Sequence, residues 1–313
     1  MRDVKFQVHS WRQEVKDFAW LKLWGLDGHL AAGKGAGGPW VRHVLSRVLA
    51  IHYGLERPDP ADPKAASIFF AQTSGRPAIK GMPRLMCSHI IPGFGYDFGP
   101  LRLGTYPPAV VLVRDLRCML IAHYEKWKNR YGLSWGQYLR LPWDQEKARC
   151  DLWWHIHFLN RWGDCAKRMP NEVIGIRYED LRKNTVPNIE CILRHYDLKI
   201  PSETIRRAVN GSMETANTAI IARGANGHTT EKEDIDLARY FTGEDGEYFR
   251  DVVGRNLRHA FGYDYTQLVT KSSTKPVQHL PARTALQVDQ PYRNSSADSG
   301  SSLSQWRNKV SHG

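Results

Sequence analysis

The sequence predicts an α/β fold in which a central parallel sheet is flanked by helices. Two runs rich in β-branched residues, Val110–Val113 and Val173–Ile176, are typical of strands buried on both faces of a sheet. Helical patterns lie between and around them, and strands that alternate with helices form βαβ units with parallel strands. Ligands of such sheets bind at the carboxyl ends of the strands, so a site is expected there.

The spacing of apolar residues indicates where the helices lie. One apolar stripe is made by Val41, Val44, Leu45, Val48 and Leu49, and similar patterns predict helices over 118–130, 143–169 and 188–196. The segment Gly28–Ala32 is a further expected strand, although it lacks β-branched residues.

Composition limits the class of protein. The chain has 313 residues, of which 42% are hydrophobic and 24% charged, values that exclude a largely disordered chain. Its longest apolar runs fall short of the ~18 residues that a membrane span needs, and its first twenty residues lack the apolar core of a secretory signal. Five cysteines without a CxxC pair favour reduced thiols over disulfides or zinc. We therefore expect a soluble, cytoplasmic protein without a metal.

The chain carries a formal charge of +12, from 44 Lys and Arg against 32 Asp and Glu. Basic residues are interleaved with acidic ones, so a small anionic ligand is favoured over nucleic acid. From residue 266 to 313 the composition changes to Ser, Gln, Pro, Thr and Asn. We expect a disordered tail there with a charge of +4, after a single domain over 1–265 with a charge of +8.

A glycine-rich segment, Gly33–Trp40, precedes the first predicted helix. Glycines let consecutive N–H groups point inward, and a helix N-terminus and the charge of Lys34 add to an anion cradle. The segment is not a Walker A motif, because GxxxxGK[ST] is absent, and an ordinary turn is the alternative.

An arginine, Arg114, follows the predicted strand Val110–Val113, at the position where a bound phosphate is expected. The alternative is a structural role, either an ion pair with Asp115 or a cap for the next helix. Two further polar segments follow in the chain, Arg177–Leu181 after the second strand and the glycine-containing loop Ala222–Gly227.

Taken together, these segments resemble the cytosolic sulfotransferases that use 3′-phosphoadenosine 5′-phosphosulfate (PAPS). The match rests on LVRDLR, which is similar to LVRDPRD, and on IRYEDL, which is similar to RYEDL. Weaker similarities are RGANG to the late KGxxG loop, GPWVR to the end of the phosphosulfate loop, and FGYDY to the closing lGY. The resemblance covers roughly residues 28–265 and implies a P-loop-like three-layer fold.

The resemblance also implies roles for individual residues. It assigns Arg114, Arg223 and Gly224 to the 3′-phosphate of PAPS, Tyr178 to a place beside the nucleotide and Trp40 to the adenine. In the phosphosulfate loop it implies that the backbone from Gly35 through Ala36 and Gly37 to Gly38 binds the donor, and that Lys34 stabilises the bridging oxygen.

His89 matches the catalytic base of the family's KTH segment, and a histidine suits the removal of a hydroxyl proton near neutral pH. Positioning and cationic stabilisation of the leaving phosphate carry such a reaction without a metal.

Four positions depart from the family pattern. Lys34 lies one residue further from Trp40 than the family lysine, whose place Gly35 holds. Pro39 replaces a Thr or Ser and has no N–H to donate, Ala122 replaces a serine unless His123 substitutes for it, and Cys87 replaces a lysine.

Two other groups of residues are expected to be structural. His155 and His157 stand two positions apart on a helix and do not share a face, so packing is favoured over metal binding. Most of the eleven tryptophans are expected in the core, with a few near an acceptor.

The acceptor, a small molecule or a carbohydrate, is not identified by the sequence, and neither is the oligomeric state. The pocket for the acceptor is expected near residues 69–99 and 131–143. Two alternatives stay open: a catalytically degenerate binding protein for anionic ligands, and a P-loop phosphotransferase, which the missing Walker A motif disfavours.

Overall fold

The computed structural model describes residues 26–58, 70, 81–92, 107–142, 151–223 and 235–267, with side chains up to 212 in the fifth range. The predicted tail beyond residue 267, the position Gly224 and most of the predicted acceptor segment 69–99 lie outside the described residues.

Four parallel strands form the sheet, in the order β2-β1-β3-β4. They are β1 (Gly28–Ala32), β2 (Leu85–Ser88), β3 (Ala109–Val113) and β4 (Val173–Arg177). The central strand β1 pairs with β2 from Gly28 opposite Leu85, and with β3 from His29 opposite Ala109. The predicted parallel α/β fold is confirmed, and β2 is a strand that the sequence patterns did not predict.

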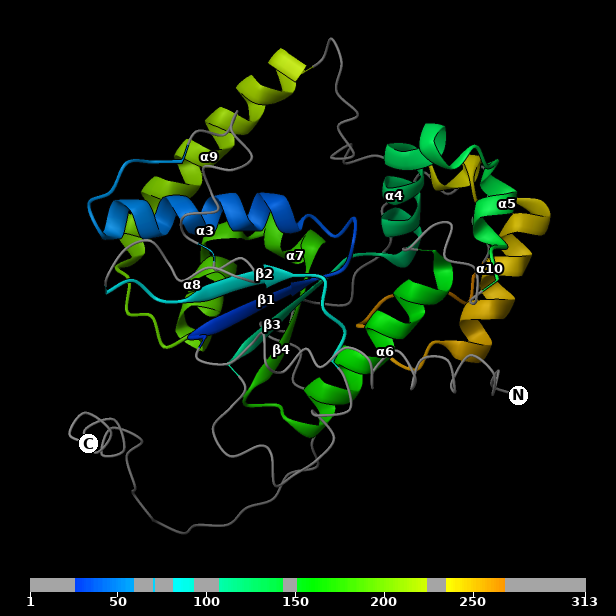
Figure 1. The fold of residues 1–313 in the computed structure, drawn as a ribbon, viewed down its shortest axis with the longest axis horizontal. Coiled ribbons are helices and arrows are strands. Elements are labelled where there is room, and N and C mark those ends of the chain that lie inside the picture. Colours follow the sequence, from blue (N-terminus) through cyan, green and yellow to red (C-terminus); the bar gives the residue numbers. More distant parts are fainter. Residues whose placement is uncertain are drawn as a thin grey trace.

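Helices surround this sheet: α3 (Gly38–His52), α4 (Leu116–Tyr131), α5 (Trp135–Leu139), α6 (Leu152–Arg168), α7 (Tyr178–Lys183), α8 (Thr185–His195), α9 (Ser202–Arg223) and α10 (Gly243–Asn256), with a 3-10 turn at Leu237–Arg239. Figure 1 shows α3 and α9 along one side of the sheet and α6 passing beside β4. Helices α4, α5 and α10 gather beyond the carboxyl ends of the strands (Figure 1).

The predicted helices are present with shifted ends. Helix α4 begins at Leu116 because the Asp115 side chain accepts a hydrogen bond from the N–H of Arg117. The described part of the helix predicted over 143–169 begins at Leu152, where the side chain of Asp151 accepts from the N–H of Trp154. Helices α9 and α10 were not predicted.

The core lies between the sheet and these helices. All residues of β1 and β3 are buried, and the whole predicted stripe of α3 is fully buried: Val41, Val44, Leu45, Val48 and Leu49. Among the described residues, no helix is both long and apolar enough to cross a bilayer.

Candidate active site

The glycine-rich segment forms a tight loop between β1 and α3. Gly35 and Gly37 have φ angles of 84° and 85°, a left-handed conformation that favours glycine. A Cβ atom on Gly37 would lie 2.3 Å from the ring of Tyr178, so the close approach also requires glycine there. The N–H of Ala36 donates to the carbonyl of Gly33 and closes the turn.

Three N–H groups of this loop are available to a ligand. Within the described residues, the N–H groups of Gly35, Gly37 and Gly38 have no hydrogen-bond partner. They lie at the N-terminus of α3, a 15-residue helix whose dipole adds partial positive charge. Pro39 falls in the first turn, where its missing N–H costs the helix nothing but removes a donor from the cradle. The loop therefore has the geometry of an anion site.

Lys34 is held against helix α6. Its carbonyl oxygen lies 3.0 Å from Nε2 of His155, and its Nζ lies 5.0 Å from the ring centroid of Trp154. The predicted packing role of His155 is correct, since the residue is fully buried. Its contact with the loop was not foreseen from the sequence.

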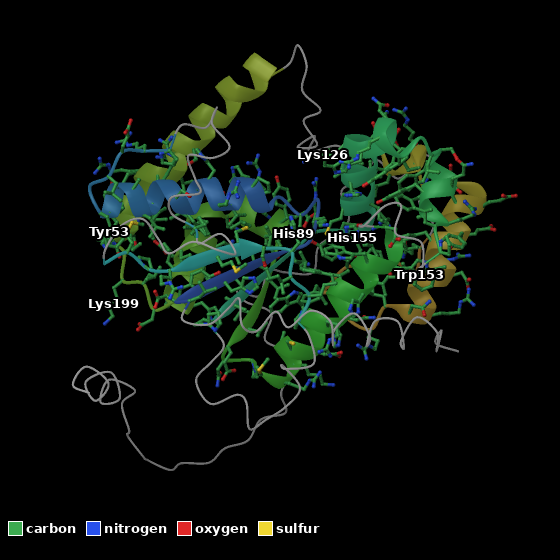
Figure 2. The ribbon with its side chains drawn as sticks, in the orientation of Figure 1. Tyr53, His89, Lys126, Trp153, His155 and Lys199 are labelled. Carbon is green, nitrogen blue, oxygen red and sulfur yellow. The ribbon has the colours of Figure 1, made fainter. Side chains whose placement is uncertain are left out.

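His89 directly follows β2, next to the end of β1 (Figure 2). Its Nδ1 lies 2.6 Å from the carbonyl oxygen of Ala32. Because a carbonyl oxygen only accepts, Nδ1 carries the proton of the neutral ring and Nε2 keeps its lone pair. Burial lowers the pKa of His89, and the charges of Lys34, Lys126 and Arg42 lower it further, against the opposing hydrogen bond to Ala32. The imidazole is therefore a neutral base at pH 7.

Arg114 directly follows β3 and is buried. Its Nη1 donates to the carbonyl of Gly35 at 3.4 Å, and its guanidinium lies 4.8 Å from the ring centroid of Tyr178. The expected alternative, an ion pair with Asp115, is not formed. Asp115 instead caps α4 and pairs with Arg117, whose Nη2 lies 2.6 Å from its carboxylate.

Aromatic residues complete this side of the site. Trp40 is buried and meets Tyr178 edge to face at a centroid distance of 6.2 Å. The guanidinium of Arg182 lies 5.0 Å from the Trp40 ring centroid, and no sequence pattern indicated this contact. The structure thus brings Lys34, Gly35, Trp40, Arg114 and Tyr178 together around one loop.

Two departures from the family pattern, Ala122 and Cys87, and the candidate substitute His123 now have a structural meaning. Ala122 faces the loop, since its Cβ lies 3.4 Å from a Cβ built on Gly35, but a methyl group offers no hydrogen bond. Nδ1 of His123 lies 3.2 Å from the hydroxyl of Tyr138, on whose ring His123 stacks. Burial raises the pKa of Cys87 to about 11, so its neutral thiol does not replace the charge of a lysine.

The late glycine segment differs from the expectation at its start. Ala222 and Arg223 are the last residues of helix α9 rather than part of a loop, because the helix continues through them. The side chain of Arg223 and the whole of Gly224 lie outside the described residues. In the part of the chain that the structure describes, no group of three His, Cys, Asp or Glu side chains is arranged to hold a metal.

Comparison with known proteins identifies the class. A family model described as the sulfotransferase domain matches residues 66–257, more than half of the chain. The chain therefore belongs to the sulfotransferase family. The matched range includes His89, Arg114 and Tyr178, whereas the glycine loop lies before it.

Solved structures that resemble this chain include a mouse sulfotransferase complexed with PAP (3′-phosphoadenosine 5′-phosphate). The two chains are 12% identical, the TM-score is 0.48, and the match covers 74% of this chain and 84% of that one. A retinol dehydratase with androsterone and inactive cofactor PAP has 16% identity and a TM-score of 0.46, over 79% and 86% of the two chains. Its complex with retinol and PAP has the same identity and coverage, with a TM-score of 0.48. A search of curated proteins gave no match.

Proposed function

We propose that this sulfotransferase moves a sulfuryl group from PAPS to a hydroxyl or amine of a small-molecule or carbohydrate acceptor. One observation carries the proposal. His89 is neutral, and its Nδ1 donates to the carbonyl of Ala32. It follows β2 at the same edge of the sheet as the glycine loop and Arg114. A base and an anion cradle at one sheet edge suit transfer from an anionic donor.

In the proposed reaction, the acceptor oxygen or nitrogen attacks the sulfur of PAPS as Nε2 of His89 takes its proton. The bond from sulfur to the bridging oxygen breaks, and 3′-phosphoadenosine 5′-phosphate (PAP) leaves with the electron pair. Lys34 stabilises the charge that develops on the bridging oxygen.

The donor is held by two groups of residues in this proposal. The backbone of Gly35, Ala36, Gly37 and Gly38 binds the 5′-phosphosulfate, while Trp40 and Tyr178 lie beside the nucleotide. Arg114, Arg223 and Gly224 bind the 3′-phosphate, for which the guanidinium of Arg114 is a charge-assisted donor.

Calorimetric titration with PAP tests the donor assignment. We expect micromolar binding that weakens by about 10- to 100-fold in Arg114→Ala, because hydrogen bonds to charged groups are worth about 1.5–3 kcal/mol. Arg130→Ala is the matched control, since Arg130 is an exposed arginine near the end of α4, the helix that follows Arg114. Equal binding by wild type and Arg114→Ala overturns the donor assignment.

Incubation with ³⁵S-labelled PAPS and panels of phenols, sugars and amines tests the transfer itself. Label in one class of acceptor identifies the substrate class. PAP binding without transfer to any panel favours a degenerate binding protein, which Pro39 and Ala122 would explain. Magnesium-dependent ATP turnover in place of sulfuryl transfer indicates a phosphotransferase.

A further inference from the structure

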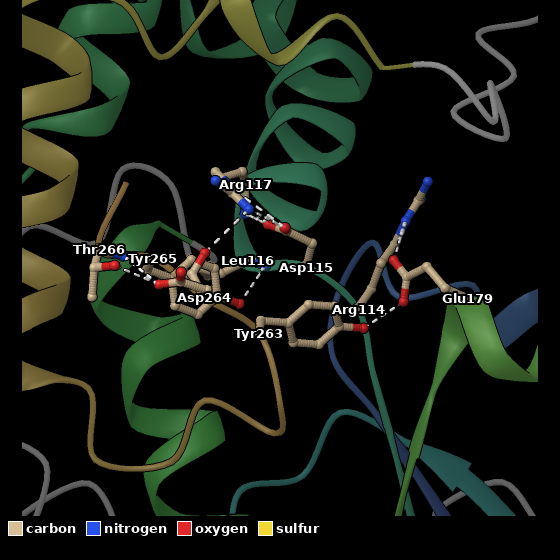
Figure 3. A network of polar contacts seen from close by, with 9 residues as sticks. All are labelled: Arg114, Asp115, Leu116, Arg117, Glu179, Tyr263, Asp264, Tyr265 and Thr266. Carbon is tan, nitrogen blue, oxygen red and sulfur yellow. Dashed lines mark hydrogen bonds and ion pairs between the residues drawn. The ribbon is translucent and has the colours of Figure 1, made fainter. Parts of the chain in front are cut away.

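Residues 257–265, close to the end of the described chain, run from the end of α10 to the starts of α4 and α7, and we call this segment the closing arm (Figure 3). The hydroxyl of Tyr265 accepts a hydrogen bond of 3.0 Å from the N–H of Leu116. The guanidinium of Arg117 lies 5.4 Å from the Tyr265 ring centroid and also contacts the carbonyl of Asp264. These contacts fix the arm beside Arg114.

The arm reaches the phosphate-site arginine through one carboxylate. Oε2 of Glu179, in the first turn of α7, accepts a hydrogen bond from the hydroxyl of Tyr263. Oε1 of the same carboxylate lies 4.0 Å from Nε of Arg114. Figure 3 shows this chain of contacts from Tyr263 through Glu179 to Arg114. Burial and the nearby Glu179 carboxylate raise the pKa of Tyr263, so its hydroxyl stays protonated and remains a donor.

Arg114 is not fully engaged by this carboxylate. Its Nε is buried without a hydrogen-bond partner in the described part of the chain, and its separation from Glu179 is at the limit of an ion pair. Tyr263 therefore holds Glu179 close enough to act on Arg114 electrostatically, yet too far to bind it directly. A phosphate that binds Arg114 meets a negative charge that is fixed nearby.

We propose that Glu179 is a positioning counter-ion for Arg114, held off by Tyr263, that weakens retention of the nucleotide's 3′-phosphate and so speeds release of the spent nucleotide. This inference rests on the proposed function, because it takes PAP as the product. The two residues act in opposite directions: the Glu179 charge repels the phosphate, and the Tyr263 hydroxyl prevents Glu179 from occupying Arg114.

Dissociation constants for PAP test the inference in wild type, Glu179→Gln, Tyr263→Phe and the double variant. Glu179→Gln removes the charge and should bind PAP about tenfold more tightly, mainly through slower dissociation. Tyr263→Phe frees the carboxylate to pair with Arg114 and should bind PAP about threefold more weakly. In the Glu179→Gln background, Tyr263→Phe should have no effect, because its action passes through the carboxylate.

Two controls separate this electrostatic action from a general one. Glu203→Gln removes the same charge from an exposed side chain on α9 and should leave PAP binding unchanged. Adenosine 5′-phosphate, which lacks the 3′-phosphate, should bind wild type and Glu179→Gln equally.

The outcomes distinguish the two proposals. This inference alone is overturned if wild type binds PAP, Arg114→Ala loses that binding, and Glu179→Gln binds PAP as tightly as wild type or more weakly. Equal effects of Tyr263→Phe in both backgrounds also overturn it, since they indicate a merely structural tyrosine. Wild type that does not bind PAP overturns the proposed function and this inference with it.

Discussion

Nε2 of His155 lies 3.0 Å from the carbonyl oxygen of Lys34, although the two residues are 121 positions apart in the sequence. Its other ring nitrogen, Nδ1, lies 2.8 Å from the carbonyl oxygen of Asp151. Burial lowers the pKa of His155 to about 4, so the ring is neutral and carries one N–H for two carbonyl partners. The imidazole therefore lies between the glycine loop and the N-cap of α6, and its single N–H donates to one of the two carbonyls.

Replacing His155 by leucine should displace Lys34 from its place near His89. We expect kcat to fall by about 10- to 100-fold, because small misplacements of a catalytic group are costly, while the affinity for PAP changes less. His155→Gln keeps an N–H donor and should recover part of the loss. His157→Leu, two residues along the same helix, is the control; an unchanged kcat in His155→Leu contradicts the assignment.

Replacing His89 by asparagine should remove the proposed base. Turnover should fall by about 10²- to 10⁴-fold, the usual contribution of general-base catalysis, while PAP binding is kept. Steady-state kinetics and calorimetry on the same preparation measure the two effects.

The pH profile of the wild type provides an independent check on His89. The pKa of His89 is lowered from 6.5, chiefly by burial, so the base form persists below that pH. We expect kcat/KM to be constant from neutral pH downward and to fall only below pH 6.5. An acid limb centred above 6.5 argues against His89 as the base.

Replacing Gly37 by alanine should destabilise the fold. The residue has a φ of 85°, and its new Cβ would lie 2.3 Å from the Tyr178 ring, so we expect a loss of about 2–4 kcal/mol in the free energy of unfolding. Gly54→Ala is the matched control, because Gly54 has a φ of 65° with nothing within 4 Å. It should lose about 1–2 kcal/mol from backbone strain alone. Equal losses in urea unfolding would show that the ring contact has no effect.

Replacing Pro39 by threonine should strengthen donor binding. Pro39 is exposed in the first turn of α3, and threonine adds an N–H and a hydroxyl to the anion cradle. We expect about tenfold tighter binding of PAP, as for a hydrogen bond to a charged group. Adenosine 3′-phosphate, which lacks the 5′-phosphate, should show no gain; a gain for both ligands would place the effect elsewhere.

Buried histidines should make stability depend on pH. Burial lowers the pKa of His29 to about 3, and burial with nearby charges lowers that of His123 to about 3. In the unfolded chain these two histidines bind protons near pH 6.5, whereas in the folded protein they stay neutral until about pH 3. They therefore lower the stability as pH falls from 6.5 towards 3. Asp151 acts in the opposite direction, because burial raises its pKa to about 7 and its stabilising effect is lost as pH rises from 3.8 to 7.

As pH falls, the three buried histidines His29, His123 and His155 together lower the stability by more than Asp151 raises it. We therefore expect a lower urea midpoint at pH 5 than at pH 7.5. The difference should shrink in His29→Gln and persist in the exposed His52→Gln. An equal pH dependence in all three proteins contradicts the assignment.

Local patterns predicted the elements whose own residues show that they are buried, through a β-branched run or an apolar stripe. The β-branched run Val110–Val113 belongs to β3, and the stripe that begins at Val41 belongs to α3. Strand β2 reads LMCS, has no β-branched residue, and is defined by its pairing with β1. No local pattern contains that information.

The site divides in the same way. His89, Arg114 and Tyr178 were predicted, because each belongs to a short motif that follows or opens one element. The contacts that orient the motifs join distant residues, as Tyr263 joins Glu179 across 84 positions. The sequence of a single chain does not reveal such pairs, although the FGYDY segment is similar to the family's closing lGY.

The closing arm also has a consequence for how the protein is made. Leu116 and Tyr265, which it joins, are 149 residues apart, and contacts of such separation form late and slow folding. Translation delivers α4 and α7 before the arm, so Arg114 and Glu179 are made before Tyr263, which in our proposal holds the carboxylate off the arginine. On that proposal the carboxylate is therefore free to pair with the arginine until residues 257–265 have been made.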